Sequence, residues 1–304
     1  MEVEVPKVSI VILNWNGLED TEECLESLKR ITYPNYEVIV VDNGSTGDDV
    51  KVLRDRFGEY IQIIENDRNY GFAEGNNIGI RHALEGDFKY VLLLNNDTTV
   101  AADFLSELVN IAESDPKIGL AGPKIYLYRE PNRIWFAGGK ISLFSRSSSR
   151  GLNLIDRGQF NRLDYVDFIS GCCMLIKRRV LDSAGLLDPV YFFAMEDVDM
   201  SLRATQAGFS NVFVPASKIW HKVFRSGIRE PDIGYYTARN PIILARKHYR
   251  VFKKGVIRAV LAVFIELLIC SIRFRSVSTI VIMIRGFRDG LTIDLKSSKA
   301  GQAT

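Results

Sequence analysis

The chain has 304 residues, of which 47% are hydrophobic and 25% are charged, and it carries a net charge of +2. This composition is ordinary for a globular protein, and the length suits one large domain or a domain with a substantial appendage. The four cysteines form no Cys-x-x-Cys pair and no His/Cys cluster with zinc spacing. Neither a disulfide framework nor a structural zinc site is therefore indicated.

The net charge hides an asymmetry between the C-terminal region and the rest. From Arg246 to the end there are twelve Lys/Arg and three Asp/Glu residues, a balance of +9 that leaves −7 for the remainder. A mildly acidic body argues against a nucleic-acid binder, whose basic surface normally lies on the folded domain. A basic tail fits an anionic lipid surface better. Because Met1-Glu-Val-Glu4 leads straight into a strand, we expect no signal peptide and a cytoplasmic, reducing location.

The N-terminal part of the chain alternates between short apolar runs and stretches in which apolar residues recur at helical spacing. The apolar runs predict buried strands, and the spaced patterns predict the helices that cover them. Strands that alternate with helices imply right-handed crossovers and a mostly parallel sheet. The predicted strands are 8–13, 36–41, 61–64 and 90–94, and the predicted helices are 18–28, 50–57 and 71–84.

Each strand of this unit is followed by a polar residue, namely Asn14, Asp42, Asn66 and Asp97. The carboxyl ends of parallel strands share one edge of a sheet, and open α/β sheets bind their ligands there. Asp97 offers a hard oxygen ligand for Mg²⁺ or Mn²⁺, with substrate phosphates completing the coordination shell. The alternative is a plain strand-to-loop turn, because Asn and Asp are common turn residues.

The segment from Ile118 to Ile176 changes character, with short strands broken by prolines and by Gly138-Gly139. Its most loop-like part is Ser145–Gly151, which we expect to be a solvated connection or else a flap over a substrate. The elements predicted next are a buried strand over 168–176, a short helix over 178–184 and a helix that opens with 192–199 and ends near 208.

The tail contains two apolar stretches, Val256–Ile272, which Arg258 and Glu266 interrupt, and Val277–Ile284. Crossing a bilayer takes about 20 apolar residues with few charges, and neither stretch supplies them. Apolar helices edged by Lys and Arg are typical of an interfacial anchor, so we expect the tail to lie on a membrane surface. A spanning hairpin and an oligomer contact are the alternatives.

Several further side chains suggest binding or catalysis, each with a structural alternative. Asp42 could accept hydrogen bonds from the polar edge of a nucleobase. Asn69–Asn77 enters a helix with two glycines, which let the backbone approach a ligand, although the same segment could serve as a helix cap. Glu196 and Asp197 stand at a helix start, where carboxylates are favoured as caps in any case. His221 could bind a metal, although a single histidine is more often structural.

Taken in order, these motifs resemble those of glycosyltransferase family 2, and most closely its rhamnosyltransferase-like branch. The resemblance covers about residues 6–245 and leaves the tail outside it. The matching stretches are Val8–Gly17, Val41-Asp-Asn-Gly-Ser45, Asn69-Tyr-Gly-Phe72 with Asn77, Leu94-Asn-Asn-Asp97, Gly171, Glu196-Asp-Val-Asp-Met-Ser-Leu-Arg203, His221 with Ser226, and Arg239-Asn240.

The resemblance implies a GT-A fold for residues 1–245, an α/β, Rossmann-like, mostly parallel sheet with a nucleotide-binding half and an acceptor-binding half. It also implies an inverting transfer of a sugar from a nucleotide-diphosphate sugar to a hydroxyl of a glycan or lipid-linked acceptor. Residues 246–304 would add a C-terminal amphipathic helical tail, basic and apolar, that contacts the anionic membrane surface. The protein would then be peripheral on the inner face of the cell membrane.

Carried over by position, the resemblance assigns site residues to three groups. Asp197 matches the catalytic base, with Glu196 beside it. Asp97 and His221 match the site of a divalent metal, Mg²⁺ or Mn²⁺, and Asn95 stands where the family's metal motif usually has its first aspartate. One carboxylate contact to the metal is therefore missing. The nucleotide-sugar-binding group comprises Asn14, Asn16, Asp42, Asn43, Gly71, Asn77 and Asn96, with Asp42 holding the base.

The chemistry of such a transfer agrees with those roles. A divalent cation stabilises the negative charge that develops on the departing diphosphate. Inversion needs a base on the face opposite the leaving group, and such a base typically contributes about 10²–10⁴-fold. A neighbouring Glu196 and partial burial would raise the pKa of Asp197 and strengthen it as a base. Asp199 and Arg203, at i,i+4 spacing, are expected to form a structural ion pair.

Three other functions compete with this interpretation. A sugar-phosphate nucleotidyltransferase would have a Gly-rich phosphate loop near the first strand, which Asn14-Trp-Asn-Gly17 does not supply. A dinucleotide oxidoreductase would carry Gly-x-Gly-x-x-Gly, which is absent. A non-catalytic nucleotide-sugar or glycan-binding relative at the membrane surface would share the fold. Asp97, Asp197 and His221 favour the enzyme, whereas Asn95 favours the non-catalytic relative.

Overall fold

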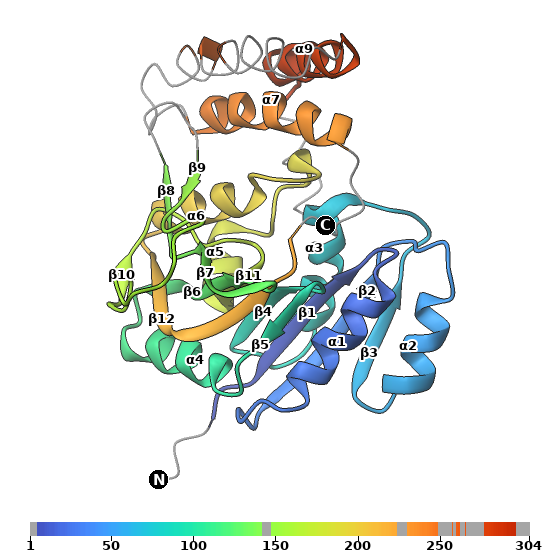
Figure 1. The fold of residues 1–304 in the computed structure, drawn as a ribbon, viewed down its shortest axis with the longest axis vertical. Coiled ribbons are helices and arrows are strands. Elements are labelled where there is room, and N and C mark those ends of the chain that lie inside the picture. The colour runs from blue at the N-terminus through green and yellow to red at the C-terminus, as the bar shows by residue number, and fades with distance from the viewer. Residues whose placement is uncertain are drawn as a thin grey trace.

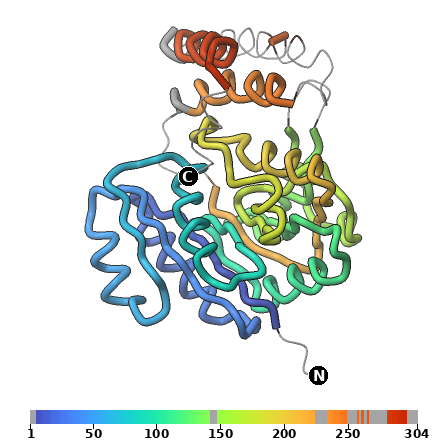
Figure 2. The backbone as a smooth tube through the Cα atoms, turned by 180° about the vertical axis from the view of Figure 1, so that it is seen from behind, coloured from blue at the N-terminus to red at the C-terminus, as the bar shows by residue number. Residues whose placement is uncertain are grey.

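The computed structural model describes residues 5–141, 147–223, 230–248 and 277–295, together with the isolated positions 257, 260, 261 and 265. An α/β body makes up most of the molecule, and two C-terminal helices are stacked on one end of it (Figures 1 and 2).

The first part of the body follows the predicted alternation of strands and helices. It consists of β1 (Val8–Asn14), α1 (Leu18–Leu28), β2 (Tyr36–Asp42), α2 (Asp49–Phe57), β3 (Ile61–Glu65), α3 (Gly71–Leu84) and β4 (Tyr90–Asn95). The strands pair in parallel in the order β3-β2-β1-β4. In this register Asn14 lies opposite Asp42, and Leu13 lies opposite Asn95. The polar strand ends therefore meet at one edge, as predicted.

The second part of the body adds further strands, which complete a ten-stranded sheet and also form a separate two-stranded sheet. Its elements are β5 (Thr98–Val100), α4 (Phe104–Ser114), β6 (Ile118–Leu127), β7 (Glu130–Phe136), β8 (Gly139–Ile141), β9 (Ser147–Ser149), β10 (Asp164–Tyr165), β11 (Cys173–Lys177), α5 (Arg178–Ala184), the 3₁₀ turn η1 (Pro189–Tyr191), α6 (Glu196–Gln206) and β12 (Ser210–His221). The order across the sheet is β10-β12-β6-β11-β4-β1-β2-β3, with β5 on β12 and β7 on β6.

Parallel pairing, which we expected for most of the sheet, is confined to its first part and to β6 with β12. Strand β11 runs antiparallel to both of its neighbours, β4 and β6. Parallel neighbours require a crossover connection, usually through a helix, and the described residues between β6 and β11 contain strands and turns but no helix. The fold is therefore the predicted α/β class, with a mixed second half.

Strand β1 lacks charge because both faces of the sheet are covered. Val8, Ile10 and Ile12 of β1 point to one face, where they pack with α1, α2 and α4. Val11 points to the other face, which α3, α5 and α6 cover. Alternating side chains of one strand therefore fill two separate cores, which is why the run shows no polar–apolar alternation.

Three predicted elements in the middle of the chain have different bounds in the structure. The helix expected to open with 192–199 begins only at Glu196, because residues 192, 194 and 195 have positive φ angles. The strand expected over 168–176 begins only at Cys173, because the Cys173 N–H closes a turn on the Ser170 carbonyl at 3.2 Å. Residues 168–172 are thereby left as a loop. In the Ser145–Gly151 segment, Ser147–Ser149 form strand β9 against β8 and are not a loop. Part of that segment, residues 145–146, lies outside the described residues.

The C-terminal helices are α7 (Glu230–Lys247) and α9 (Val277–Thr292), which pack on each other through Ala238, Ile242, Ala245 and Met283. Arg246 donates to the carbonyls of Gly290 at 2.8 Å and Ile293 at 2.9 Å. The predicted boundary between residues 245 and 246 falls inside α7, so this helix links the body to the tail.

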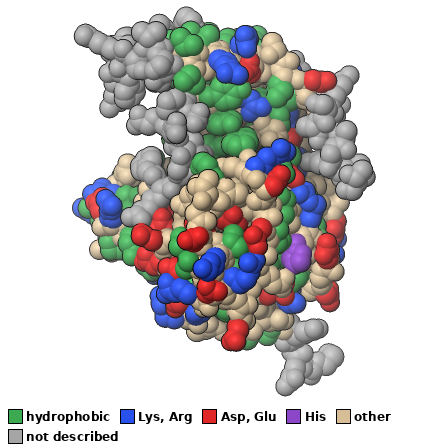
Figure 3. Space-filling view, turned by 90° about the vertical axis from the view of Figure 1, so that its right-hand side faces the viewer, with side chains coloured by type: hydrophobic (Ala, Val, Ile, Leu, Met, Phe, Trp, Pro, Cys, Tyr) green, Lys and Arg blue, Asp and Glu red, His purple; other side chains and the backbone are tan. Residues whose placement is uncertain are grey.

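The tail presents apolar and basic side chains to solvent. Val281 and Ile284 of α9 are exposed, and so are Arg285 and Arg288. On the face drawn in Figure 3, hydrophobic side chains gather in the upper part around the two helices, whereas acidic and basic side chains are interspersed below. Most of the predicted stretch 256–272 lies outside the described residues. In the described part of the chain, no helix combines the length and apolarity needed to cross a membrane.

Candidate active site

A cavity of about 440 Å³ opens at the carboxyl ends of β1 and β4. The loop before β11 and the turn before α6 form its opposite wall. Seven of the residues singled out from the sequence line this cavity, namely Asn43, Gly71, Asn96, Asp97, Glu196, Asp197 and His221. The structure thus brings the predicted metal residues and the predicted base into one space.

Asp97 and His221, the two predicted metal residues, lie next to each other. Strand β12 pairs with β5 so that His221 stands opposite Thr98, and its Nε2 lies 3.0 Å from Asp97 Oδ1. The other ring nitrogen of His221, Nδ1, is buried without a hydrogen-bond partner. Trp135 packs edge-on against the His221 ring, with the ring centroids 4.6 Å apart. The contact between Asp97 and His221 joins residues 124 positions apart, and the pairing of β12 with β5 creates it.

The Asp97–His221 pair fits a divalent cation that shares its coordination with a substrate. Adjacent ligands of an octahedral ion with bonds of about 2.1 Å lie about 3.0 Å apart, which matches the separation of the two side chains. Among the described residues, no group of three or more His, Cys, Asp or Glu side chains could hold a metal. Mg²⁺ sites commonly combine one or two carboxylates with substrate phosphates and water, so a two-residue site is chemically sufficient.

Asp197, the predicted base, is half-buried in the opposite wall and held by two backbone N–H groups. Its Oδ2 accepts from Gly171 N at 2.9 Å, and its Oδ1 accepts from Val198 N at 2.8 Å. Burial raises the pKa of the Asp197 carboxyl, while these backbone hydrogen bonds oppose the rise. The direction agrees with the expectation from the sequence, and the hydrogen bonds fix the orientation of the carboxylate.

Glu196, beside the base, has no comparable support. Its Oε2 is buried and lacks a hydrogen-bond partner. Burial, and then the charge of Asp197, raise the pKa of the Glu196 carboxyl well above its ordinary value. The two neighbouring carboxyls therefore differ in character: Asp197 is oriented by donors that stabilise its charge, whereas Glu196 is disposed to remain protonated.

The turn that leads into α6 has a strained backbone. Phe192, Ala194 and Met195 have φ angles of +29°, +65° and +78°, although none of them is glycine. Gly71 packs so closely against this turn that a Cβ on it would lie 2.6 Å from the Phe192 carbonyl oxygen. The Phe72 N–H donates to that same carbonyl at 2.6 Å. Gly71 therefore permits the start of α3 to approach the turn.

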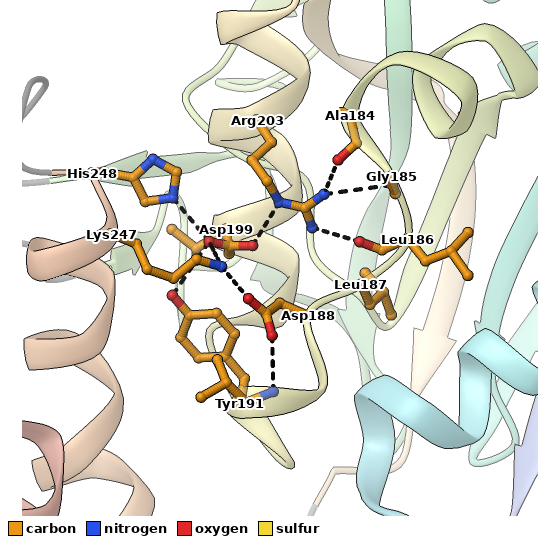
Figure 4. Close-up of polar contacts among 12 residues, drawn as sticks. Ala184, Gly185, Leu186, Leu187, Asp188, Tyr191, Asp199, Arg203, Lys247 and His248 are labelled. Carbon is orange, nitrogen blue, oxygen red and sulfur yellow. Dashed lines mark hydrogen bonds and ion pairs between the residues drawn. The ribbon is translucent and has the colours of Figure 1, made fainter. Parts of the chain in front are cut away.

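Asp199 forms the structural ion pair expected from its spacing to Arg203, with Nε at 2.7 Å from Oδ2. The same buried carboxylate binds Lys247 Nζ at 2.8 Å and His248 Nε2 at 2.9 Å, both from the end of α7 (Figure 4). Burial alone would raise the pKa of Asp199, but the hydrogen bond from His248 and the nearby cations outweigh it and lower the pKa. Asp199 thus ties α6 to α7.

Three predicted nucleotide-sugar residues lie beside the cavity without lining it. Asn14 is fully buried, and its Nδ2 donates to Asp42 Oδ1 at 2.8 Å and to Asp49 Oδ2 at 3.0 Å. Asp42 also accepts from the Ser45 backbone N–H at 2.9 Å. Asn16 accepts from the Thr46 backbone N–H at 2.8 Å. These contacts shape the loop after β2, and nucleotide binding by these residues stays a prediction.

Asn77 lies further away, on the covered side of α3. Its Nδ2 donates to the Leu187 carbonyl at 2.8 Å, and its Oδ1 accepts from the Leu187 N–H at 3.0 Å. Both ends of the amide are therefore used to connect α3 to the segment before η1. Its expected contact with a nucleotide stays a prediction, and the structure gives Asn77 a different partner.

Sequence reasoning missed the aromatic wall of the cavity, which Phe72, Trp135, Phe192 and Phe193 form. Phe192 stacks on Tyr236 of α7 with ring centroids 5.6 Å apart and an interplanar angle of 9°. The adjacent Phe192-Phe193 was a visible signal, but its partners come from remote parts of the chain. Such convergence of aromatic and polar groups is typical of ligand pockets.

A mixed α/β sheet with carboxylates and a histidine at its carboxyl edge defines a GT-A-like protein, and comparisons with known proteins agree. In a search of solved structures, GalNAc-T7 with UDP, GalNAc and Mn²⁺ superposes with a TM-score of 0.64 at 19% identity, over 81% of this chain and 48% of that one. The model of the family "Glycosyl transferase family 2" matches residues 9–185. The chain belongs to glycosyl transferase family 2.

Two curated relatives describe the similarity further. The uncharacterized protein y4gI of Sinorhizobium fredii is 32% identical over 71% of this chain, which spans only 24% of that longer protein. The N-acetylglucosaminyl-diphospho-decaprenol L-rhamnosyltransferase of Mycobacterium tuberculosis is 26% identical over 88% of this chain and 94% of its own length. This similarity supports the rhamnosyltransferase-like branch predicted from the sequence.

Proposed function

We propose that the protein is an inverting glycosyltransferase that moves a sugar from a nucleotide-diphosphate sugar to a hydroxyl of a glycan or lipid-linked acceptor. The observation that carries the proposal is the presence of two distinct pairs in one cavity, Asp97 with His221 and Glu196 with Asp197. A binding module has no need of a carboxylate oriented by two backbone donors beside a pair that could hold a metal, whereas a transfer reaction uses both.

Asp97 and His221 would hold a divalent cation together with the diphosphate of the donor. The cation would supply positive charge against the negative charge that develops on the leaving group. The carboxyl edge of β1 and β2, with Asp42 and Asn43, would receive the nucleoside. GalNAc-T7, which shares the fold, was solved with UDP and Mn²⁺, and this supports a nucleotide and a divalent metal as ligands of this protein.

Asp197 would accept the proton of the attacking acceptor hydroxyl. Its two backbone hydrogen bonds keep the carboxylate in a fixed orientation beside the cavity that it lines. The raised pKa brings its basicity closer to what proton transfer at neutral pH requires. Attack from this side, opposite a leaving group near Asp97, would invert the configuration of the transferred sugar.

The acceptor would bind along the aromatic wall and meet the protein at a membrane surface. Phe193 and Ile233, the latter on α7, line the cavity. Sugars and lipids both pack on apolar and aromatic surfaces of this kind. The exposed Val281 and Ile284 of α9, next to the exposed Arg285 and Arg288, suit contact with anionic lipid. The relative that acts on a decaprenol-linked sugar, by its name, supports a lipid-linked acceptor and a peripheral position on the inner membrane face.

A donor panel tests this function directly. Binding and hydrolysis of uridine, guanosine and thymidine diphosphate sugars would be measured with Mn²⁺, with Mg²⁺ and with a chelator. We expect one donor to bind and turn over in a metal-dependent manner. If no donor and no free nucleotide binds under any condition, the transferase proposal fails. The protein would then be interpreted as a non-catalytic relative, which the amide at Asn95 favours.

A further inference from the structure

The turn from Phe192 to Met195 cannot hold its shape by its own preferences. Three of its four residues have positive φ angles, a region that side chains with a Cβ rarely adopt. Such strain persists only where the surroundings fix the backbone, and it tends to occur at functional sites. This turn immediately precedes Glu196 and Asp197, so its conformation decides where α6 begins and where the base points.

Asn240 of α7 supplies the restraint. Its side chain is fully buried, and its Nδ2 donates to the carbonyls of Phe193 and Ala194, each at 2.8 Å. Its Oδ1 accepts from Arg239 Nη1 at 3.0 Å, and that same nitrogen donates to the Val190 carbonyl at 2.8 Å. The amide therefore satisfies two consecutive carbonyls of the turn that have no backbone donor within it.

Helix α7 is itself fixed to α6 at a second place. Lys247 Nζ binds both Asp188, at 2.5 Å, and Asp199, at 2.8 Å, and His248 binds Asp199 from the same end of the helix (Figure 4). Between these anchors and Asn240, α7 is held against both sides of the turn. A helix anchored at both of these places can therefore set the position of the turn.

We infer that Asn240 is a positioning residue, which acts through the Phe192–Met195 turn to place the carboxylate of Asp197 against the acceptor hydroxyl. The inference rests on the proposed function and adds to it a residue that touches no substrate. Asn240 is fully buried and does not line the cavity, and both of its amide hydrogens are already used on the protein.

The decisive variant is Asn240→Ala, compared with Asn240→Asp, which keeps the size of the side chain but removes its donors. Misplacement of a reacting group by about 1 Å can cost about 10²-fold in rate. We expect kcat to fall by about that factor in both variants, while donor affinity measured by calorimetry stays near that of the wild type. The acid limb of the kcat–pH profile should also move to lower pH, because a displaced, better-solvated Asp197 would have a more ordinary pKa.

Asn211→Ala is the matched control. Asn211 is also a buried asparagine, and its Nδ2 donates to the carbonyls of Asp167 at 3.0 Å and Ser201 at 3.2 Å, behind the middle of α6. Its removal should lower Tm about as much as Asn240→Ala but leave kcat and its pH profile close to wild type. Equal losses of kcat in the two alanine variants, or unchanged kcat in Asn240→Ala, would overturn the inference.

The proposed function can fail separately. If Asp197→Asn retains wild-type turnover, Asp197 is not the base and the proposed mechanism is wrong, whatever Asn240 does. If Asp197→Asn is inactive and Asn240→Ala is fully active, the mechanism stands and only the positioning role of Asn240 is refuted.

Discussion

The two walls of the cavity are supported in different ways. At the carboxyl end of β1 and β2, Asn14 and Asp42 are register partners, and their side chains bond each other and the adjacent loop. At the turn before α6, by contrast, the backbone is strained, Glu196 Oε2 has no partner, and the restraint comes from a helix that follows much later in the chain. The first wall is a product of sheet pairing, and the second depends on tertiary packing.

The comparison suggests where the protein tolerates change. The family-model match ends at residue 185, so it includes the first wall and excludes Asp197, His221 and α7. The part that would bind the nucleotide therefore rests on elements common to the family. The part that would bind the acceptor and move the proton rests on contacts between segments remote in the chain, so substitutions there should affect catalysis more than folding.

Asp197→Asn should produce the largest effect. The amide keeps the shape of the side chain but cannot accept the proton, so kcat should fall by about 10²–10⁴-fold. Donor affinity should change little, because the donor would lie against the other wall. Steady-state kinetics combined with calorimetric donor titration checks this, and wild-type turnover in the variant would remove the base assignment.

Asp97→Ala should mainly weaken donor binding. Loss of even an outer partner of a metal ligand typically costs about 10–100-fold in metal affinity, so removal of Asp97 itself should cost at least that much. Titrations of the donor with Mn²⁺ and with a chelator measure the effect. The wild type should lose affinity when the metal is removed, whereas the variant should bind equally weakly in both conditions. A variant that still responds to Mn²⁺ as the wild type does would place the metal elsewhere.

Asn14→Ala should destabilise the first wall without changing the chemistry. Its removal leaves Asp42 and Asp49 without the amide that donates to both, and an unsatisfied buried polar group costs about 1–3 kcal/mol. Urea unfolding should show this loss, while kcat of the folded protein stays within about twofold. A large drop in kcat with normal stability would mean that the two walls do not differ as described.

Glu196→Gln should give the smallest and most pH-dependent effect. The folded-state pKa of Glu196 is raised, so its contribution is fully present below the unfolded pKa, about 4.3, and is lost as the pH rises through the folded value. The neutral amide avoids this loss, so the Tm of the variant should increasingly exceed that of the wild type as the pH rises. Thermal unfolding across pH measures it, and the two proteins should converge near pH 4. A constant difference at all pH values would contradict a protonated Glu196.

The sequence by itself determined the elements of the first wall and the edge of the sheet at which the candidate site lies. Unbroken apolar runs such as Val8–Leu13 predict strands covered on both faces, and the polar residues at their ends predict the binding edge, because the structure of a parallel sheet follows from local pattern. The roles of Asp97, His221 and Asp197 came from the resemblance to the family, and they stay predictions.

Only the tertiary structure decided which of those side chains meet and what supports them. Periodicity shows which face of an element is buried but not against what, so it could not foresee the antiparallel insertion of β11, the use of Asn77 on Leu187, or the contact of Asn240 with the turn before the base. Each of these joins segments dozens of residues apart, and such contacts arise from the packing of whole elements against one another.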